Sequence, residues 1–169
     1  MPPPGYQAYQ QAPAAQYGSW IARVGATLVD GIVSSLFMAP ALIALFAGPK
    51  KIDYCSSNLN FEEGSLCEVP NSTSIALMVG LGAIGVIAFM VLYCKKVGST
   101  GQSWGHKAVG LRVVDAQSGA AIGGGRAFGR YLARIISAIP CYLGFLWPLW
   151  DQRKQTFHDK IVGTVVLKA

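Results

Sequence analysis

The chain has 169 residues, enough for one ordinary domain, and 52% of them are hydrophobic while only 13% are charged. Typical soluble domains carry about 25% charged residues, so this composition is too apolar for a water-facing surface of this size. The net charge of +6 is not gathered into a basic stretch with interleaved aromatic residues, which excludes nucleic acid as an expected partner.

The first 18 residues consist mainly of Pro, Gln, Tyr, Ala and Gly, and they include no charged residue. Such a segment buries too little apolar surface to offset its ordering entropy. We therefore predict a disordered cytoplasmic tail over 1–18, followed by one membrane domain over 19–167. The triplet Pro2-Pro3-Pro4 leaves a second interpretation open, a docking peptide for the groove of a partner.

Two apolar runs are long enough to cross a membrane. Residues 24–47 include one charge, Asp30, and residues 75–93 include none. A helix needs about 20 apolar residues to span the hydrocarbon core, so we predict transmembrane helices at about 20–47 and 75–93. The first run follows an uncharged tail and exceeds the length of a signal-peptide core, which argues against cleavage.

Charge placement predicts the orientation, because Lys and Arg favour the cytoplasmic flanks of membrane helices. The loop 48–74 carries two Lys against four acidic residues, whereas the chain after residue 93 is rich in Lys and Arg. We therefore expect a multi-pass protein of the bacterial inner membrane. Its N-terminus and the segment 94–127 would be cytoplasmic, the loop 48–74 would be external, and the lipid bilayer would be its first partner.

Two of the four cysteines, Cys55 and Cys67, fall in the predicted external loop. An oxidising exterior permits a disulfide, so we predict the pair Cys55–Cys67, with two free thiols as the alternative. The loop contains no His, which argues against zinc. We expect neither a metal site nor a cofactor.

Three arginines repeat every four residues after the second run: Arg126, Arg130 and Arg134. They form one basic stripe on a predicted amphipathic helix over about 125–137. On the cytoplasmic face of the membrane, such a stripe suits contact with anionic lipid headgroups.

A third apolar stretch, 135–150, contains Pro140 and Pro148. A complete crossing there would leave the basic C-terminal residues outside, against the usual charge bias. We therefore divide the segment 128–150 into the end of the amphipathic helix and a short re-entrant piece. A full third crossing stays the alternative.

Two short β-branched runs, 110–115 and 163–167, have strand character. Neither is stable alone, so we predict that they pair in a small cytoplasmic sheet, with 151–167 closing the domain. The predicted fold class is an α-helical membrane protein. It has two transmembrane helices, a cytoplasmic amphipathic helix, a short re-entrant or third membrane segment and a two-stranded β pair.

The first predicted helix carries two charges on one face. Arg23 and Asp30 lie nearly two turns apart, with Thr27 between them. Arg23 is near the interface and can snorkel, whereas an unpaired carboxylate at Asp30 is strongly unfavourable or takes up a proton. Asp30 is therefore either an ion or proton site or part of a packing network. The arginines of the amphipathic helix are its expected partners.

Three segments resemble motifs of a known family: Trp20-Ile-Ala-Arg23 with Leu28-Val-Asp30, Gly101-Gln-Ser-Trp-Gly-His-Lys107 with Gly110-Leu-Arg-Val-Val-Asp115, and Gln155-Thr-Phe-His-Asp159 with Gly163-Thr-Val-Val166. Their order and spacing resemble the RDD family of bacterial membrane proteins over about 20–167, and the Pro/Gln/Tyr-rich leader resembles actinobacterial members. The resemblance implies that Asp159 is the second aspartate of the family name. It also implies transport of an unidentified ligand, with cation/proton antiport proposed for some members.

Enzyme activity is not expected, because the glycines at 123–125 lack the spacing of a nucleotide-binding loop. Two hypotheses remain. The first is an ion- or proton-linked transporter with Asp30 as its intramembrane site; it would have to be an oligomer, since two helices cannot enclose a pathway. The second is a non-catalytic accessory or assembly subunit of a larger membrane complex. The second predicted helix has no charge, which favours assembly under both hypotheses.

Overall fold

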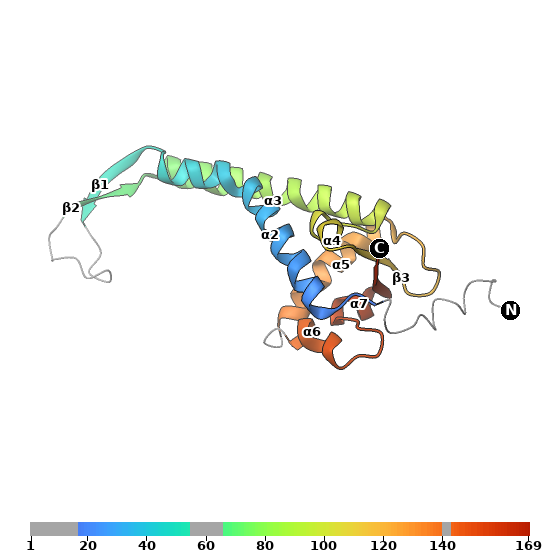
Figure 1. Ribbon diagram of the computed structural model, residues 1–169. Coiled ribbons are helices and arrows are strands. Elements are labelled where there is room, and N and C mark those ends of the chain that lie inside the picture. Colours follow the sequence, from blue (N-terminus) through green and yellow to red (C-terminus); the bar gives the residue numbers. More distant parts are fainter. Residues whose placement is uncertain (1–16, 55–65, 140–142) are drawn as a thin grey trace. The chain divides into compact units, whose positions relative to one another are not determined.

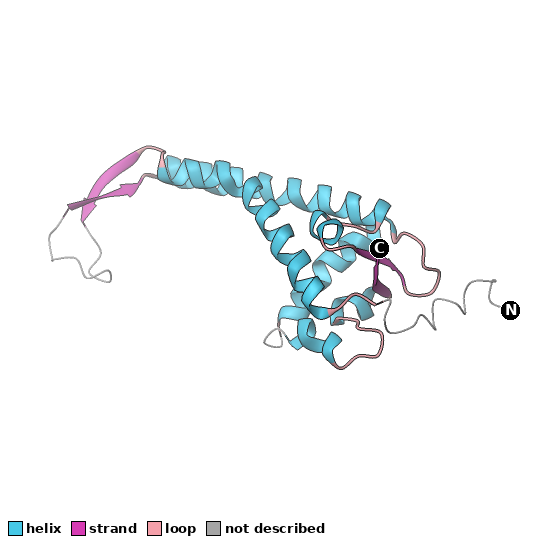
Figure 2. Cartoon of the chain, in the orientation of Figure 1, coloured by secondary structure: helices cyan, strands magenta, loops and turns pink. Residues whose placement is uncertain are grey.

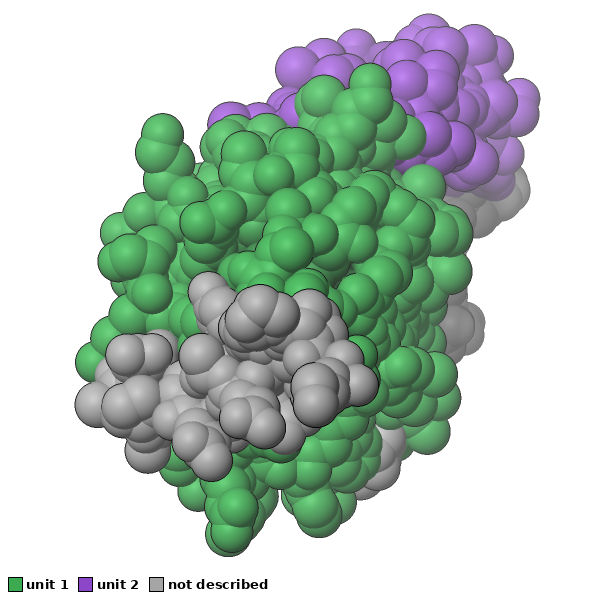
Figure 3. Space-filling view, turned by 90° about the vertical axis from the view of Figure 1, so that its right-hand side faces the viewer, with its two compact units in different colours: residues 1–33, 90–169 green, residues 34–89 purple. Residues whose placement is uncertain are grey.

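The structure is a computed structural model that describes residues 17–54, 66–139 and 143–169 (Figure 1). Helices make up most of this part of the chain, and four short strands accompany them (Figure 2). The chain divides into two compact units, coloured separately in Figure 3. Unit 1 comprises 1–33 with 90–169, and unit 2 comprises 34–89.

Two long helices, α2 (Trp20–Phe46) and α3 (Ser72–Thr100), run through both units. Both are long and apolar enough to cross a membrane, as the sequence predicts. Their exposed side chains include many large apolar ones such as Leu36 and Ile84, which is typical of a lipid-facing surface. Helix α3 begins earlier than expected and continues past residue 93 to Thr100.

In unit 2 the two helices approach closely at a glycine. A Cβ atom on Gly85 would collide with the backbone carbonyl of Phe37 and the side chain of Met38. The Phe37 and Phe89 rings meet edge to face, with centroids 5.8 Å apart. The small residue therefore permits the apolar packing of this unit.

Unit 2 also contains a sheet that the sequence analysis did not predict. Strand β1 (Lys50–Tyr54) pairs antiparallel with β2 (Leu66–Pro70), and Ile52 lies opposite Glu68. Both strands lie within the predicted external loop, which therefore contains regular structure.

Unit 1 contains the predicted β pair. Strand β3 (Leu111–Asp115) pairs antiparallel with β4 (Thr164–Lys168), and Val113 lies opposite Val166. Both of these valines are fully buried. Tyr17 bridges to Leu167, and the Gly18 N–H donates to the Val166 carbonyl at 2.8 Å. These two residues of the expected tail therefore join the sheet, while the rest of the tail, 1–16, lies outside the described residues.

The remaining helices of unit 1 are short, apart from one. They are α4 (Trp104–Ala108), α5 (Gly123–Ala138), α6 (Leu143–Leu146), the 3-10 helix η3 (Trp147–Leu149) and α7 (Phe157–Val162). Helix α5 corresponds to the predicted amphipathic helix. The third apolar stretch, 135–150, forms the end of α5, the helix α6 and the 3-10 helix η3. Residues 140–142 lie outside the described residues. Among the described helices, only α2 and α3 have the length and hydropathy of membrane spans.

Helix α7 has well-defined ends. The Thr156 hydroxyl accepts from the Asp159 N–H while the Asp159 carboxylate accepts from the Thr156 N–H, which is a capping box. Gly163 ends the helix in the left-handed region, with φ +66°. This local structure holds the Asp159 carboxylate at the start of α7.

Candidate functional site

The centre of unit 1 is a carboxylate between two arginines. Arg23 on α2 reaches Oδ2 of Asp159 with Nη1 at 2.8 Å. Arg130 on α5 donates to Oδ1 with Nε at 2.9 Å and with Nη2 at 2.6 Å. The Asp159 side chain is 0% exposed and that of Arg130 is 4% exposed. The triad therefore joins α2, α5 and α7 through charge-assisted hydrogen bonds.

Asp159 remains ionised in this setting. Burial by itself would raise the pKa of its carboxyl group, but Arg130 and Arg23 outweigh burial and hold the pKa well below its usual range. Because two guanidinium groups share one carboxylate, removing that carboxylate would leave two buried positive charges without a counter-ion.

Asp30 lies in a separate hydrogen-bond network. The Ser103 hydroxyl lies 2.6 Å from Oδ2 of Asp30, and the Gly105 N–H donates to Oδ1 at 2.8 Å. Ser103 also lies 2.6 Å from Nδ1 of His106 and caps α4 by accepting from the His106 N–H. Asp30, Ser103 and His106 are all buried. They form a continuous hydrogen-bonded chain from the Asp30 carboxylate on α2 to the His106 imidazole.

A glycine permits the close approach of α4 to α2. A Cβ atom on Gly105 would overlap the backbone carbonyl of Ala26. Only a residue without a side chain fits there, and the same residue offers its N–H to Asp30.

Both histidines of the chain are buried in this unit. The Ser137 hydroxyl accepts from the His158 N–H at 3.1 Å and lies 3.0 Å from its Nδ1. Burial lowers the pKa of His106 and of His158 well below the usual value, and the nearby arginines lower both further. Both imidazoles are therefore neutral near pH 7.

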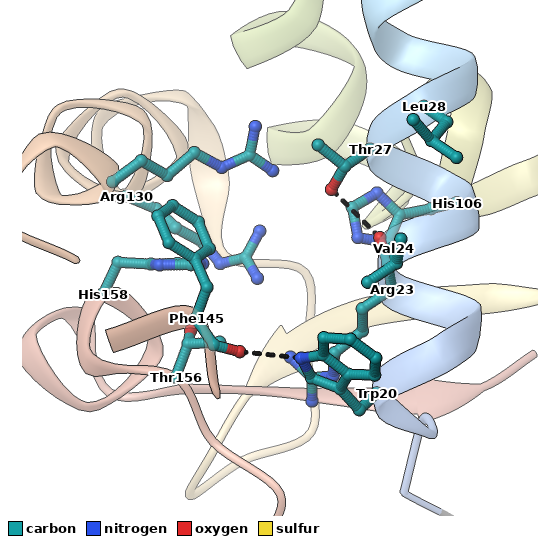
Figure 4. Close-up of a pocket in the computed structure, with 11 residues that line it drawn as sticks. Trp20, Arg23, Val24, Thr27, Leu28, His106, Arg130, Phe145, Thr156 and His158 are labelled. Carbon is teal, nitrogen blue, oxygen red and sulfur yellow. Dashed lines mark hydrogen bonds between the residues drawn. The ribbon is translucent and has the colours of Figure 1, made fainter. Parts of the chain in front are cut away.

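Arg23, Arg130, His106 and His158 line a pocket of about 330 Å³. Figure 4 shows Trp20, Arg23 and Thr27 along α2, with Arg130 and Phe145 across from them. The Trp20 indole N–H donates to the Phe145 carbonyl at 3.0 Å. Most of the lining is apolar, and the charged part is guanidinium. Within 17–54, 66–139 and 143–169, no three His, Cys, Asp or Glu residues are placed to share a metal ion.

The predicted site residues therefore fall into two networks. Arg23 pairs with Asp159, while Asp30 bonds to Ser103 and Gly105. The expected partnership between Asp30 and the arginines of the amphipathic helix is wrong, since Arg130 pairs with Asp159. Thr27 donates to the Arg23 carbonyl at 2.9 Å and lines the pocket.

The basic stripe of α5 is largely occupied by protein groups. Arg126 pairs with Asp115 and donates to the Val162 carbonyl at 2.7 Å. Arg134 donates to the Tyr93 hydroxyl at 2.6 Å. Arg130 is turned inward to Asp159, in place of the expected lipid headgroup. Contact of Arg126 and Arg134 with lipid stays a prediction.

Cysteine placement is described in part. Cys67 on β2 is disulfide-bonded, whereas Cys55 lies outside the described residues. The pairing Cys55–Cys67 therefore stays a prediction. Cys94 on α3 is a free, buried thiol.

Sequence reasoning missed Ser103 and Tyr93 as members of these networks, and it placed His106 in a motif without a role. Ser103 directly precedes α4, and this position was a usable signal because Ser is a favoured N-cap residue. No local pattern indicated Tyr93, whose partner Arg134 is 41 residues away.

The fold and site define a membrane protein with two long apolar helices and a unit built around buried Arg–Asp contacts. The chain belongs to the RDD family, whose model matches residues 17–163.

Individual relatives are similar over most of the chain. A proline-rich antigen homolog of Mycobacterium tuberculosis is 32% identical over 94% of this chain and 66% of its own length. The proline-rich antigen of Mycobacterium leprae is 30% identical over 95% of this chain and 64% of its own. The chain thus spans about two thirds of these relatives. An uncharacterized protein, YxaI, of Bacillus subtilis is 31% identical over 89% of this chain and 95% of its own. No solved structure matches significantly.

Proposed function

We propose that this protein works in ion- or proton-linked transport across the bacterial inner membrane, as an oligomer, with Asp30 as its intramembrane site. No catalytic role is part of the proposal. The N-terminus and the segment 94–127 are cytoplasmic and the loop 48–74 is external, which the distribution of Lys and Arg supports.

One observation carries the transport proposal. Asp30, on an apolar helix, is joined through Ser103 to His106, and His106 lines the pocket. A buried carboxylate with a hydrogen-bonded route to a cavity has the arrangement that a proton site requires.

The hydrogen-bonded chain from His106 through Ser103 to Asp30 supports the transfer of one proton from the pocket to α2. Ser103 donates to Asp30, and it can accept from His106 when that ring carries its proton on Nδ1. A proton that binds Nε2 of His106 from the pocket lets the Nδ1 proton pass to Ser103 and the Ser103 proton pass to Asp30. The result is neutral Asp30 and neutral His106 of the other tautomer, so one proton has moved from the pocket to α2.

The number of spanning helices supports the proposed oligomer. The described residues include two helices of spanning length, and two helices cannot enclose a pathway. A transported ion must therefore cross between copies of this chain or between this chain and another membrane protein.

The alternative is an accessory or assembly subunit without transport. It is favoured by the fact that both oxygens of Asp30 accept hydrogen bonds from the Ser103–Gly105 segment. This is also what a network that fixes helix packing requires.

Asp30→Asn separates the two functions. The full chain would be reconstituted in liposomes that hold a pH-sensitive dye, and Na⁺ or K⁺ gradients would be imposed. Transport predicts a change of internal pH that Asp30→Asn abolishes while its melting temperature is retained. Asp53→Asn, in an exposed ion pair with Lys51, is the control. Proton movement that is absent from wild type, or unchanged in folded Asp30→Asn, contradicts transport; an unfolded variant supports the packing role.

Assembly is tested by the mass of the purified protein. We expect a homo-oligomer or a complex with other chains in mild detergent. A monomer without co-purifying chains would contradict both functions.

A further inference from the structure

Two residues that line the pocket each carry a buried hydrogen-bond donor without an acceptor in the part of the chain that the structure describes. Nη2 of Arg23 and Nη1 of Arg130 are buried atoms without a hydrogen-bond partner among the described residues. Both arginines line the pocket (Figure 4). A buried guanidinium donor without an acceptor is strongly unfavourable, so two of them at one cavity indicate an absent acceptor.

The charge around the pocket is also unbalanced. Arg23, Arg130 and Arg134 all line it, and among the described residues only the Asp159 carboxylate forms an ion pair with any of them. Asp30 accepts from Ser103 and Gly105 instead. A water molecule could accept the free N–H groups, but only an anion both accepts them and offsets the excess positive charge.

Apolar side chains make up most of the rest of the lining, which also includes Thr27, Thr156, His106 and His158. The apolar side chains are those of Trp20, Val24, Leu28 and Phe145. Val24 and Leu28 are 38% and 65% exposed on α2, so the wall of the pocket is continuous with the apolar surface of that helix. A ligand that fits both parts has an anionic head and an apolar chain.

We propose that the pocket binds an amphipathic anion, whose phosphate or carboxylate head accepts hydrogen bonds from Arg23 and Arg130 and whose apolar chain leaves along Val24 and Leu28. The head could belong to a membrane lipid or to a soluble amphiphile, since the chemistry is shared. This binding site does not depend on the proposed transport, and ligand binding to it can be measured without a transport assay.

Two pairs of variants test the site. Arg130→Lys keeps the charge beside Asp159 but removes the planar group with its free nitrogen. Its control is Arg126→Lys, because Arg126 pairs with Asp115 and does not line the pocket. Val24→Trp fills part of the cavity and leaves the three residues of the triad unchanged in identity. Its control is Ile21→Trp, because Ile21 is 76% exposed on the same helix and does not line the pocket.

The measurement is calorimetric titration of the full chain in an uncharged maltoside detergent. The probes are decyl phosphate, inorganic phosphate and decyltrimethylammonium. We expect decyl phosphate to bind at least about tenfold more tightly than either other probe, and Arg130→Lys and Val24→Trp each to weaken it about tenfold. Both controls should bind as wild type does.

Three outcomes would overturn the proposal. The first is decyl phosphate binding no better than the ammonium probe. The second is wild-type affinity in both folded pocket variants; if Arg130→Lys does not fold, Val24→Trp decides alone. The third is inorganic phosphate binding as tightly as decyl phosphate, which would make the ligand a simple soluble anion and remove the apolar part of the proposal.

Discussion

The packing within unit 1 and the packing within unit 2 depend on different physical interactions. All but one of the described buried polar and charged side chains belong to unit 1, the exception being Ser74. Unit 2 packs its helical segments through apolar rings and the close approach at Gly85. The same helices, α2 and α3, take part in both arrangements.

This difference in packing indicates which unit needs charged residues to fold. Apolar packing tolerates substitution if volume is kept, whereas a buried ion network fails when one member is removed. Unit 1 therefore needs particular residue types, and unit 2 needs particular sizes. Substitutions in the two units should separate these requirements.

The largest effect should come from Asp159→Asn. It leaves Arg23 and Arg130 buried without a counter-ion, so we expect a loss of about 3–5 kcal/mol in unfolding free energy. Unfolding by SDS from mixed micelles measures it. Asp53→Asn in unit 2, whose ion-pair partner Lys51 is 56% exposed, should cost less than about 1 kcal/mol. Equal effects of the two variants would abolish the contrast between the units.

Acid should destabilise unit 1 next. The folded state holds the pKa of both histidines below the unfolded value, so their contribution is complete above about pH 6.5 and is lost as pH falls through that value. Between pH 7 and 5 we therefore expect the free energy of unfolding to fall, with a contribution from each histidine. His158→Gln should remove about half of this slope. Stability that is constant or rises over this range would contradict the prediction.

A size change should affect unit 2. Gly85→Ala places a methyl group against the Phe37 carbonyl, and overpacking of this kind costs about 1–3 kcal/mol. Gly80→Ala is the matched control on the same helix, because a Cβ there meets nothing within 4 Å. Thermal unfolding in detergent compares the two. A Gly85→Ala protein as stable as Gly80→Ala would show that close approach is not needed.

The smallest effect should come from Ser103→Ala. It removes the cap of α4 and the hydroxyl beside Asp30, for which we expect a loss of about 1–2 kcal/mol. Ser99→Ala, whose exposed hydroxyl bonds to the Lys95 carbonyl of its own helix, should stay within about 0.5 kcal/mol. A loss as large as that of Asp159→Asn would mean that the Asp30 network, rather than the triad, dominates unit 1.

Much of the fold could be predicted because it depends on local periodicity. The membrane helices follow from two apolar runs, and β3 with β4 follows from two β-branched runs that needed a partner. The pair β1 and β2 was missed because Lys50–Tyr54 mixes charged and apolar residues without a clear alternation.

The site was predicted less completely because its contacts are long-range. Helical spacing correctly placed Arg23 and Asp30 on one helix, but their partners lie at Asp159 and Ser103, 136 and 73 residues away. The spacing of Arg126, Arg130 and Arg134 showed that they share a face. It could not show that Arg130 turns inward to Asp159, because that depends on the position of α7.

The span of 136 residues between Arg23 and Asp159 also sets an order of events during synthesis. At typical bacterial elongation rates, the ribosome adds Asp159 on the order of ten seconds after Arg23. Helix α2 is therefore made well before its counter-ion exists, whereas Arg130 precedes Asp159 by only 29 residues. For that interval water or lipid phosphate must solvate the Arg23 guanidinium group, and the contacts among Arg23, Arg130 and Asp159 form only after Asp159 has left the ribosome.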